Sequence, residues 1–263
     1  MLLKDISFQT PQENILYDEV LLHLAEKGRP DQVLRFWESP ELFVCLGRIC
    51  KEDEDLKRGA VADDHISVLR RCTGGGTVLQ GKGCLNYSLI LSKERDPQIA
   101  DLRKSYQIIL SKVVDALRRL KVEASFYPIS DIALADGQKK ISGNAQKRCK
   151  KFILHHGTIL YDFDLGAIDR YLRVPKDVPE YRLGRPHLDF VANVSLSAVD
   201  IKSSLKDIFG VDRKKDALDG EERACLQSFL NRDKNPSLAR VCGIRKFSPQ
   251  SENPFGISRT NQL

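Results

Sequence analysis

Three consecutive glycines that follow two arginines are the residues of this chain best suited to chemistry. The stretch begins at Arg70 and Arg71 and continues through the glycines at positions 74–76. Ordering glycine costs more backbone entropy than ordering any other residue, so such a run indicates backbone that must pass close to something. Successive N–H groups can point into one anion, and arginine adds fork-shaped donors. The pattern predicts an anion-binding loop, with a mobile hairpin turn as the alternative.

The same segment contains half of a phosphate-binding P-loop pattern, G-x-x-x-x-G-K, over residues 76–82. Gly83 stands where that motif needs Ser or Thr for magnesium, and a P-loop must also open a helix. The next residues, Cys84–Leu91, alternate and are rich in large apolar side chains, which is typical of a strand. We therefore reject the P-loop and expect a strand, a glycine turn and a second strand.

Two adjacent lysines follow a turn signal further along the chain. Asp136-Gly137 lies between two apolar-patterned runs and predicts a two-residue hairpin turn. Side chains alternate along a strand, so Lys139 and Lys140 point to opposite faces. One is expected in solvent, and the other faces the protein, where an ammonium needs an anionic partner. Gly143 indicates a bulge or a close backbone approach. The alternative is a pair of surface lysines on an edge strand.

A third segment, residues 152–162, reads as a strand with a glycine in its middle. His155 and His156 alternate faces, so both cannot easily bind one metal ion. No Cys or carboxylate stands beside them at zinc-like spacing. We expect a hydrogen-bonded structural role for at least one of the two histidines.

The rest of the pattern supplies the elements that hold these segments in place. Apolar residues at helical spacing predict helices, and short apolar runs predict strands. The expected helices are residues 11–27, 99–120, a segment from 167, 197–208 and 215–231, and the expected strands are 33–37, 42–46, 68–71, 85–91 and 152–162. The tail after Phe247 is expected to be loose.

Together the three segments resemble the lipoate-protein ligase and octanoyltransferase family, the biotin/lipoate A/B protein ligases. Arg70–Val78 is similar to its Arg-Arg-x-(Ser/Thr)-Gly-Gly-Gly-x-Val signature. Gly137–Ala145 resembles Gly-x-Lys-(Val/Ile)-Ser-Gly-x-Ala, with Lys140 at the lysine position and one residue inserted. His155–Leu160 resembles His-His-Gly-Thr-(Leu/Ile)-Leu, and Glu13–Glu19 echoes an upstream element. The four elements occur in the order that the family has.

The resemblance implies an α/β (α+β) fold, a biotin/lipoate protein ligase-like catalytic core with a mixed, mostly antiparallel sheet flanked by helices. The core is expected over residues 1–195. Residues 196–263 are expected to form a short helical C-terminal extension with a loose tail, because they are too few for the accessory domain of long bacterial ligases. The chain departs from the family at Gln80, where His is common, and Gln cannot titrate.

The function that the resemblance implies is an ATP-dependent lipoate-protein ligase. Such an enzyme joins lipoic acid to the α-phosphate of ATP, with Mg²⁺ bound to the nucleotide. It then passes the lipoyl group to a lysine of an apo lipoyl domain. The expected acceptors are the E2 proteins of 2-oxoacid dehydrogenases or the H-type protein of glycine cleavage. A separate small accessory subunit is a further expected partner.

The candidate site consists of the residues that match the family's motifs. Lys140 is the expected catalytic residue, bridging the lipoyl carbonyl and the α-phosphate, and Arg71 is expected to hold a carboxylate or a phosphate. No metal-ligand set is expected in the protein. The residues expected to bind ATP and lipoyl-adenylate are Arg70, Arg71, Gly74, Gly75, Gly76, Thr77, Val78, Leu79, Asn86, Lys140, Gly143, Asn144, Ala145, His156, Gly157 and Thr158.

Two other functions compete with the ligase. An octanoyltransferase needs an activated cysteine facing the motif lysine. Tyr127 stands where one related branch keeps that thiol, and residues 157–224, where another keeps it, contain no cysteine. Neither branch uses the positions of Cys72, Cys84 and Cys149, so the ligase is favoured. The second competitor is a non-catalytic module that binds lipoyl domains, against which the intact motifs argue.

Composition agrees with a soluble enzyme. The 263 residues suit one large domain with at most a small appendage, and 41% hydrophobic with 30% charged residues is typical of a globular protein. The chain has no long apolar run for a membrane and no basic cluster interleaved with aromatics for nucleic acid. Seven scattered cysteines and an N-terminus without a targeting pattern indicate the cytoplasm. The net charge of +6 favours anionic ligands.

Overall fold

The computed structural model describes residues 1–136, 138–176 and 178–234, and its centre is an eight-stranded mixed sheet. The strand order is β11-β1-β2-β6-β10-β9-β8-β7. The two pairs at the β11 end are parallel, and the other pairs are antiparallel. The strands are β1 Leu2–Asp5, β2 Val33–Trp37, β6 Cys84–Ser92, β7 Ala124–Tyr127, β8 Asp131–Leu134, β9 Lys140–Arg148, β10 Phe152–Leu160 and β11 Arg213–Lys214.

A smaller sheet contains β3 (Phe43–Leu46), flanked by β4 (Ser67–Arg70) and β5 (Val78–Gln80). β4 is parallel to β3 and β5 is antiparallel to it. The glycine segment joins β4 to β5, which do not pair with each other. The expected order of a strand, the glycines and a second strand is confirmed, whereas the alternative of a hairpin turn is wrong, because β3 lies between the two strands that the glycines connect.

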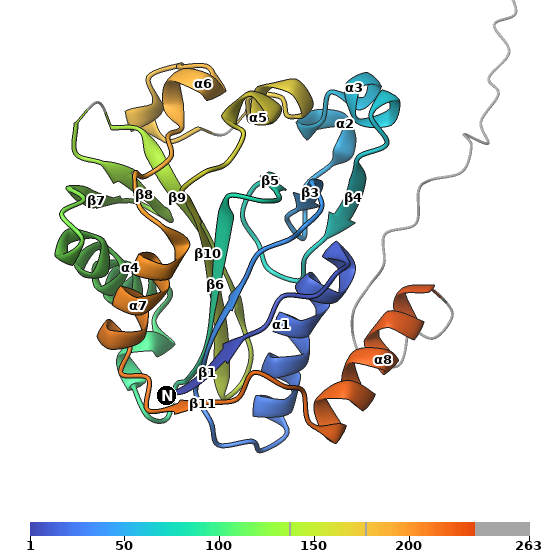
Figure 1. Cartoon of the computed structure of the whole chain (residues 1–263), viewed down its shortest axis with the longest axis vertical. Helices are drawn as coiled ribbons and strands as arrows, with labels where there is room; N and C mark the ends of the chain where they lie inside the picture. The colour runs from blue at the N-terminus through green and yellow to red at the C-terminus, as the bar shows by residue number, and fades with distance from the viewer. Residues whose placement is uncertain (137, 177, 235–263) are drawn as a thin grey trace, which may run out of the picture.

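Two helices cover opposite faces of the large sheet (Figure 1). α1 (Pro11–Glu26) buries residues such as Val20 and Leu24, and α4 (Leu102–Arg119) buries Ile109 and Val113. Both predicted helices are confirmed. α4 begins at Leu102, not at residue 99, because Asp101 is its N-cap and accepts a hydrogen bond from the N–H of Lys104 at 2.8 Å. The shorter helices are α2 Glu52–Asp55, α3 Arg58–Asp63, η1 Pro97–Ala100, α5 Leu165–Tyr171, η2 Glu180–Arg182, α6 His187–Phe190, α7 Ala198–Ile208 and α8 Gly220–Lys234.

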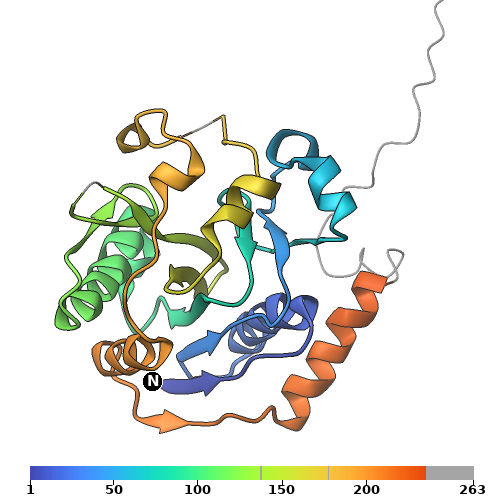
Figure 2. The ribbon, with the colours of Figure 1, turned by 45° about the horizontal axis from the view of Figure 1, so that its top comes forward.

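The residues after 195 pack directly on this framework. α7 adds Ile201 and Leu205 to the core beneath α4, and the chain then forms β11 and reaches α8, which lies beside α1 (Figure 2). The helix expected over 215–231 begins only at Gly220, and the tail after Phe247 lies outside the described residues. The division at residue 195 stays a prediction. Among the described residues, no helix is both long and apolar enough to span a bilayer.

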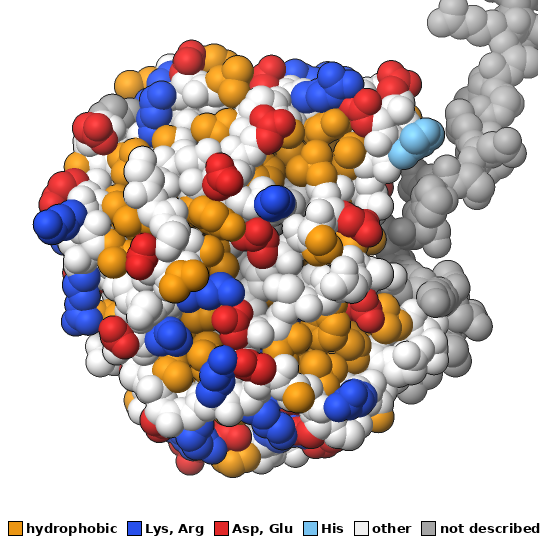
Figure 3. All heavy atoms as spheres, in the orientation of Figure 1, with side chains coloured by type: hydrophobic (Ala, Val, Ile, Leu, Met, Phe, Trp, Pro, Cys, Tyr) orange, Lys and Arg blue, Asp and Glu red, His pale blue; other side chains and the backbone are white. Residues whose placement is uncertain are grey.

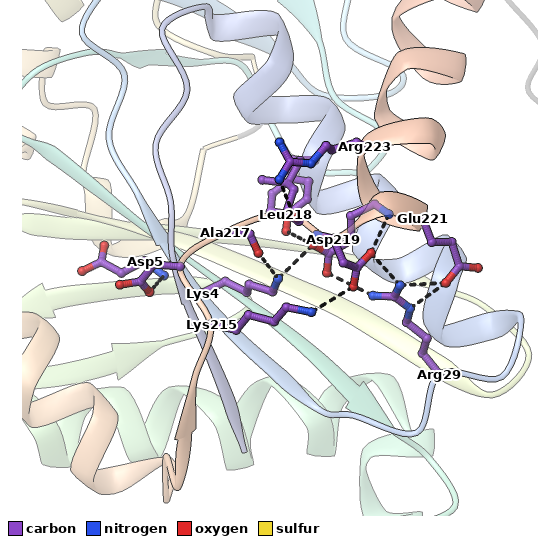
Figure 4. Close-up of polar contacts among 12 residues, drawn as sticks. Lys4, Asp5, Arg29, Lys215, Ala217, Leu218, Asp219, Glu221 and Arg223 are labelled. Carbon is purple, nitrogen blue, oxygen red and sulfur yellow. Dashed lines mark hydrogen bonds and ion pairs between the residues drawn. The ribbon is translucent and has the colours of Figure 1, made fainter.

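A buried charged cluster fastens α8 to the N-terminal elements (Figure 4). Lys4 on β1 is 0% exposed and Glu222 on α8 is 1% exposed, and their charged atoms lie 2.9 Å apart. The Tyr17 hydroxyl donates to the same carboxylate at 3.1 Å, and Arg29 donates to its other oxygen at 3.1 Å. Glu222 and Asp219 also accept hydrogen bonds from each other's backbone N–H, which fixes where the helix begins.

We predict that Glu222→Gln lowers the free energy of unfolding by about 3–5 kcal/mol, because it leaves the Lys4 ammonium buried without a countercharge. Urea unfolding followed by circular dichroism measures this. Asp53→Asn, which removes an exposed ion pair with Arg58, should leave the unfolding midpoint nearly unchanged. A loss no larger for Glu222→Gln than for Asp53→Asn would contradict the prediction.

Candidate functional site

The glycine segment curls around the side chain of Arg71, which is only 7% exposed. One terminal nitrogen of its guanidinium donates to the carbonyl oxygens of Gly74 and Gly76, each at 2.7 Å. Its Nε donates to the Thr73 hydroxyl at 2.9 Å. Arg70 likewise donates to backbone carbonyls, including that of Gly47 at 2.8 Å. The arginines therefore shape the loop, whereas the sequence led us to expect their guanidinium groups to face the anion.

The backbone N–H groups of this loop are left available. Within the described residues, those of Gly74, Gly75, Gly76 and Thr77 have no hydrogen-bond partner in the protein, and Gly75 and Gly76 are exposed. The carbonyl oxygens of Gly74 and Gly76 accept hydrogen bonds from Arg71, and that of Gly75 accepts one from the Cys50 thiol. Successive unpaired N–H groups of this kind form a concave site for an anion. The arginines hold the loop in shape, and the backbone of the loop leaves these N–H donors available.

The loop touches the lysine hairpin through Gly75, whose φ is +77°. A Cβ on Gly75 would lie 3.4 Å from the Cβ of Ala145 on β9, and a Cβ on Gly47 would lie 2.0 Å from the carbonyl oxygen of Gly75. Close packing therefore requires glycine at position 47, whereas the positive φ favours glycine at position 75. The sequence predicted only that the glycine backbone passes close to another group, and it did not identify β9 as that group.

Lys140 lies near the other end of β9 and faces the protein. Its Nζ lies 2.8 Å from Oδ1 of Asp131 on β8, whereas the Lys139 side chain is exposed. The predicted alternation of the two lysines and the antiparallel pairing of β8 with β9 are confirmed, but the predicted two-residue turn is wrong, because residues 135–139 connect the two strands. The irregularity in pairing falls beside Ile141, and Gly143 provides the close approach: a Cβ there would lie 3.2 Å from the Lys140 Nζ. Gly137 of the predicted turn lies outside the described residues.

His156 on β10 links the glycine segment to α1. Its Nε2 lies 2.8 Å from the Thr73 hydroxyl and its Nδ1 lies 3.3 Å from Oδ2 of Asp18. Asp18 also accepts hydrogen bonds from Arg35 and from Ser88, each at 2.6 Å. Burial alone would raise the pKa of the Asp18 carboxyl, but Arg35 and His156 hold it below its usual range. The local pattern does not single out Asp18, although it lies in the upstream element that resembles the family.

His155 points to the opposite face and is fully buried. Burial lowers its pKa to about 3, so the ring is neutral, and its two nitrogens lie 3.0 Å from Gln146 Nε2 and 3.3 Å from Asn144 Oδ1. The expected structural histidine is confirmed. Asn144 also accepts a hydrogen bond from the Tyr87 hydroxyl and approaches Gly157, where a Cβ would lie 1.8 Å from its Oδ1.

The other residues expected at the site lie around the glycine segment, β9 and β10. Asn86 on β6 is paired in register with Thr158 on β10 and donates to the Gln80 side chain at 2.9 Å. Thr77 donates to the carboxylate of Asp55 on α2. Val78 and Leu79 form the start of β5. The structure thus brings the glycine segment, β9 and β10 together, and it adds Asp18 and Asp131, which the sequence pattern did not single out.

Comparison with known proteins gives a consistent result. A family model described as the lipoyl protein ligase A/B catalytic domain matches residues 10–205. The chain is 31% identical over 166 residues to "Probable lipoate-protein ligase A" of Mycoplasma pneumoniae, covering 63% of the chain and 47% of that protein. It is 27% identical over 234 residues to octanoyltransferase LipM of Halalkalibacterium halodurans, covering 78% and 84%. The chain spans between 37% and 53% of the length of the lipoate-protein ligase relatives reported for it.

Solved structures share the fold. A bi-partite lipoate protein ligase from Thermoplasma acidophilum, reported with its E2 lipoyl domain, superimposes with a TM-score of 0.75 at 24% identity, covering 88% of this chain and 91% of that one. A lipoate-protein ligase A bound with ATP gives 0.73 at 24% identity, covering 88% and 94%. The expected lipoate ligase-like fold is confirmed. By its family model, its motifs and its fold, the chain belongs to the lipoyl protein ligase A/B catalytic domain family.

Proposed function

We propose that this chain is an ATP-dependent lipoate-protein ligase, which forms lipoyl-adenylate and transfers the lipoyl group to a lysine of an apo lipoyl domain. The observation that carries the proposal is the pairing of an anion site with a cation. The unpaired N–H groups of Gly74 to Thr77 lie on a loop that contacts β9, and β9 also carries Lys140. Both features suit a substrate with a phosphate next to an acyl group.

In the first step, an oxygen of the lipoate carboxylate attacks the α-phosphorus of ATP and pyrophosphate leaves. Two anions must approach each other, so fixed positive groups are needed where their charges meet. The loop N–H groups would bind phosphate oxygens, and Lys140 would lie between the carboxylate and the α-phosphate. Mg²⁺ would arrive with ATP and neutralise its phosphate oxygens.

In the second step, the acceptor lysine attacks the acyl carbon of the mixed anhydride as a neutral amine, and AMP leaves. Lys140 would stabilise the charge that develops on the carbonyl oxygen and on the departing phosphate. Arg71 would act by holding the loop in shape. Asn86 and Thr158, which are neighbours in register, would line the acyl region, and residues 143–145 with 156–157 would form the floor of the site.

An octanoyltransferase remains the second candidate, because the similarity to LipM covers 84% of that protein. The placement of the cysteines disfavours it. Burial raises the pKa of the Cys72 and Cys84 thiols, and burial also raises that of Cys149, so none is an activated thiolate. Cys50 was not considered among the candidate thiols in the sequence analysis. Its Sγ lies 3.4 Å from the carbonyl oxygen of Gly75.

The proposed partner is an apo lipoyl domain of an E2 or H-type protein, and a separate accessory subunit is a further proposed partner. The bi-partite structural neighbour supports the second partner. On the face drawn in Figure 3, Lys and Arg are interspersed with Asp and Glu, so the net charge of +6 is not gathered in one patch there.

The first prediction for this function is a strict nucleotide requirement. The chain incubated with lipoate, ATP, Mg²⁺ and an apo lipoyl domain should add one lipoyl group, measured as the mass of the domain. Omitting ATP should abolish the reaction. Equal modification from octanoyl-acyl carrier protein without nucleotide would place the protein among the transferases. Binding of the domain without pyrophosphate release would indicate a non-catalytic module.

The second prediction concerns the two lysines of the hairpin. Lys140→Ala should slow pyrophosphate release by about 100- to 1000-fold, because it removes a preorganised charge at the reacting groups. Lys139→Ala should react like the unmodified chain, since that side chain is exposed. Similar losses in the two variants would remove the case for a single bridging lysine.

The third prediction is that no cysteine forms an acyl intermediate. Cys50→Ser and Cys149→Ser should each retain lipoylation, because the serine hydroxyl replaces the thiol as a hydrogen-bond donor but cannot form a thioester. Intact-mass measurement after incubation with acyl donor, with and without hydroxylamine, tests this in the unmodified chain. A hydroxylamine-sensitive acyl adduct on any cysteine, Cys72 and Cys84 included, would favour the transferase.

A further inference from the structure

The Lys140 ammonium is held by one carboxylate and is otherwise free. Its Nζ lies 2.8 Å from Oδ1 of Asp131, and within the described residues no other protein group bonds it. The ammonium has three N–H donors, so two remain for a ligand. The Lys140 side chain is 29% exposed, whereas that of Asp131 is only 9% exposed. The buried carboxylate therefore determines where the open side of the ammonium points.

A tyrosine from a distant segment holds that carboxylate in turn. The Tyr181 hydroxyl donates to Oδ2 of Asp131 at 2.8 Å, so the two oxygens have different partners. Tyr181 belongs to η2, and its ring stacks on Tyr127 of β7 with 4.4 Å between centroids. Burial, and then the Asp131 charge, raises the pKa of Tyr181, so the phenol stays a neutral donor. The stacked ring prevents the hydroxyl from moving away from the carboxylate.

We infer that Asp131 and Tyr181 are positioning residues for Lys140. The inference rests on the proposed function and extends it to two side chains outside the family's motifs. Asp131 keeps the ammonium over Gly143 with two donors directed outward, and Tyr181 keeps the carboxylate from rotating away. A hydrogen bond to a carboxylate holds direction as well as charge. The amine is thus in place before the substrate arrives, and no reorganisation is needed at the reacting step.

The chain contains a matched control for this arrangement. The Tyr171 hydroxyl donates to Oδ2 of Asp64 at 2.9 Å, and Arg170 donates to the same carboxylate at 2.6 Å. The chemistry is a tyrosine, an aspartate and a cation, as around Lys140, but the residues lie on α5 and after α3, outside the β8–β9 hairpin. Tyr171→Phe and Asp64→Asn therefore remove equivalent bonds without touching Lys140.

The test measures binding of a stable sulfamoyl analogue of lipoyl-adenylate by calorimetry. Lys140→Ala should weaken binding on the order of 10- to 100-fold, Asp131→Asn about 10-fold, and Tyr181→Phe about 3-fold. Because Asp131 acts through the lysine, Asp131→Asn should have no further effect in the Lys140→Ala background. Tyr171→Phe and Asp64→Asn should bind the analogue like the unmodified chain.

The outcomes separate this inference from the function on which it rests. If the unmodified chain neither binds the analogue nor releases pyrophosphate, the proposed function fails. If it does both, but Asp131→Asn costs the same with and without Lys140, the aspartate only supports the fold and the inference is overturned. Unchanged affinity in both Asp131→Asn and Tyr181→Phe would also overturn it, and thermal unfolding of each variant confirms that it is folded.

Discussion

The buried ion pair between Asp18 and Arg35 is the interaction on which the site depends. Both side chains are nearly inaccessible, and their atoms lie 2.6 Å apart. All five N–H donors of Arg35 make hydrogen bonds. One goes to the Asp18 carboxylate, two go to the backbone and side-chain oxygens of Asn14, and two go to the carbonyl oxygen of Ile6. A buried pair is costly unless it is fully satisfied in this way. Because its hydrogen bonds are satisfied, the Asp18–Arg35 pair fixes α1 to β2. The second carboxylate oxygen of Asp18 then remains for Ser88 and His156.

The glycine segment receives its position from that second oxygen. His156 reaches from Asp18 to Thr73, and Thr73 accepts from Arg71, around which the glycines curl. A chain of polar contacts therefore runs from the core of the α1 face to the loop N–H groups. Flexible glycines alone would sample many shapes. Here Arg71 holds the carbonyls of Gly74 and Gly76, and the N–H groups of the loop are left available for the anion that we propose binds there.

Local patterns were sufficient for the elements whose contacts are periodic. The apolar spacing of residues 11–27 predicted α1, and alternation predicted β6. Alternation also predicted that one of Lys139 and Lys140 faces the protein, and the resemblance to the family singled out Lys140. The pairing of β4 and β5 with β3 was not predictable, because each strand pairs with a segment far away in sequence. Asp131 was missed for a related reason: an aspartate in a strand has no chemical signature until the fold places an ammonium beside it. The contacts of Arg71 within the protein were not predicted, because they are mostly to backbone carbonyls, which every residue has, and its expected role toward an anion stays a prediction.

The C-terminal elements show how a segment beyond the family match can support the same site. The family model ends at residue 205, yet β11 pairs with β1, and Glu222 on α8 neutralises Lys4 and accepts from Tyr17. The centroid of the Tyr17 ring lies 4.8 Å from the guanidinium carbon of Arg35. α8 thus reaches the Asp18–Arg35 pair through a single side chain. Leu226 and Phe229 pack against α1 through apolar contacts, which are not directional, so we expect the buried charges of Lys4 and Glu222 to fix the register of α8 along α1.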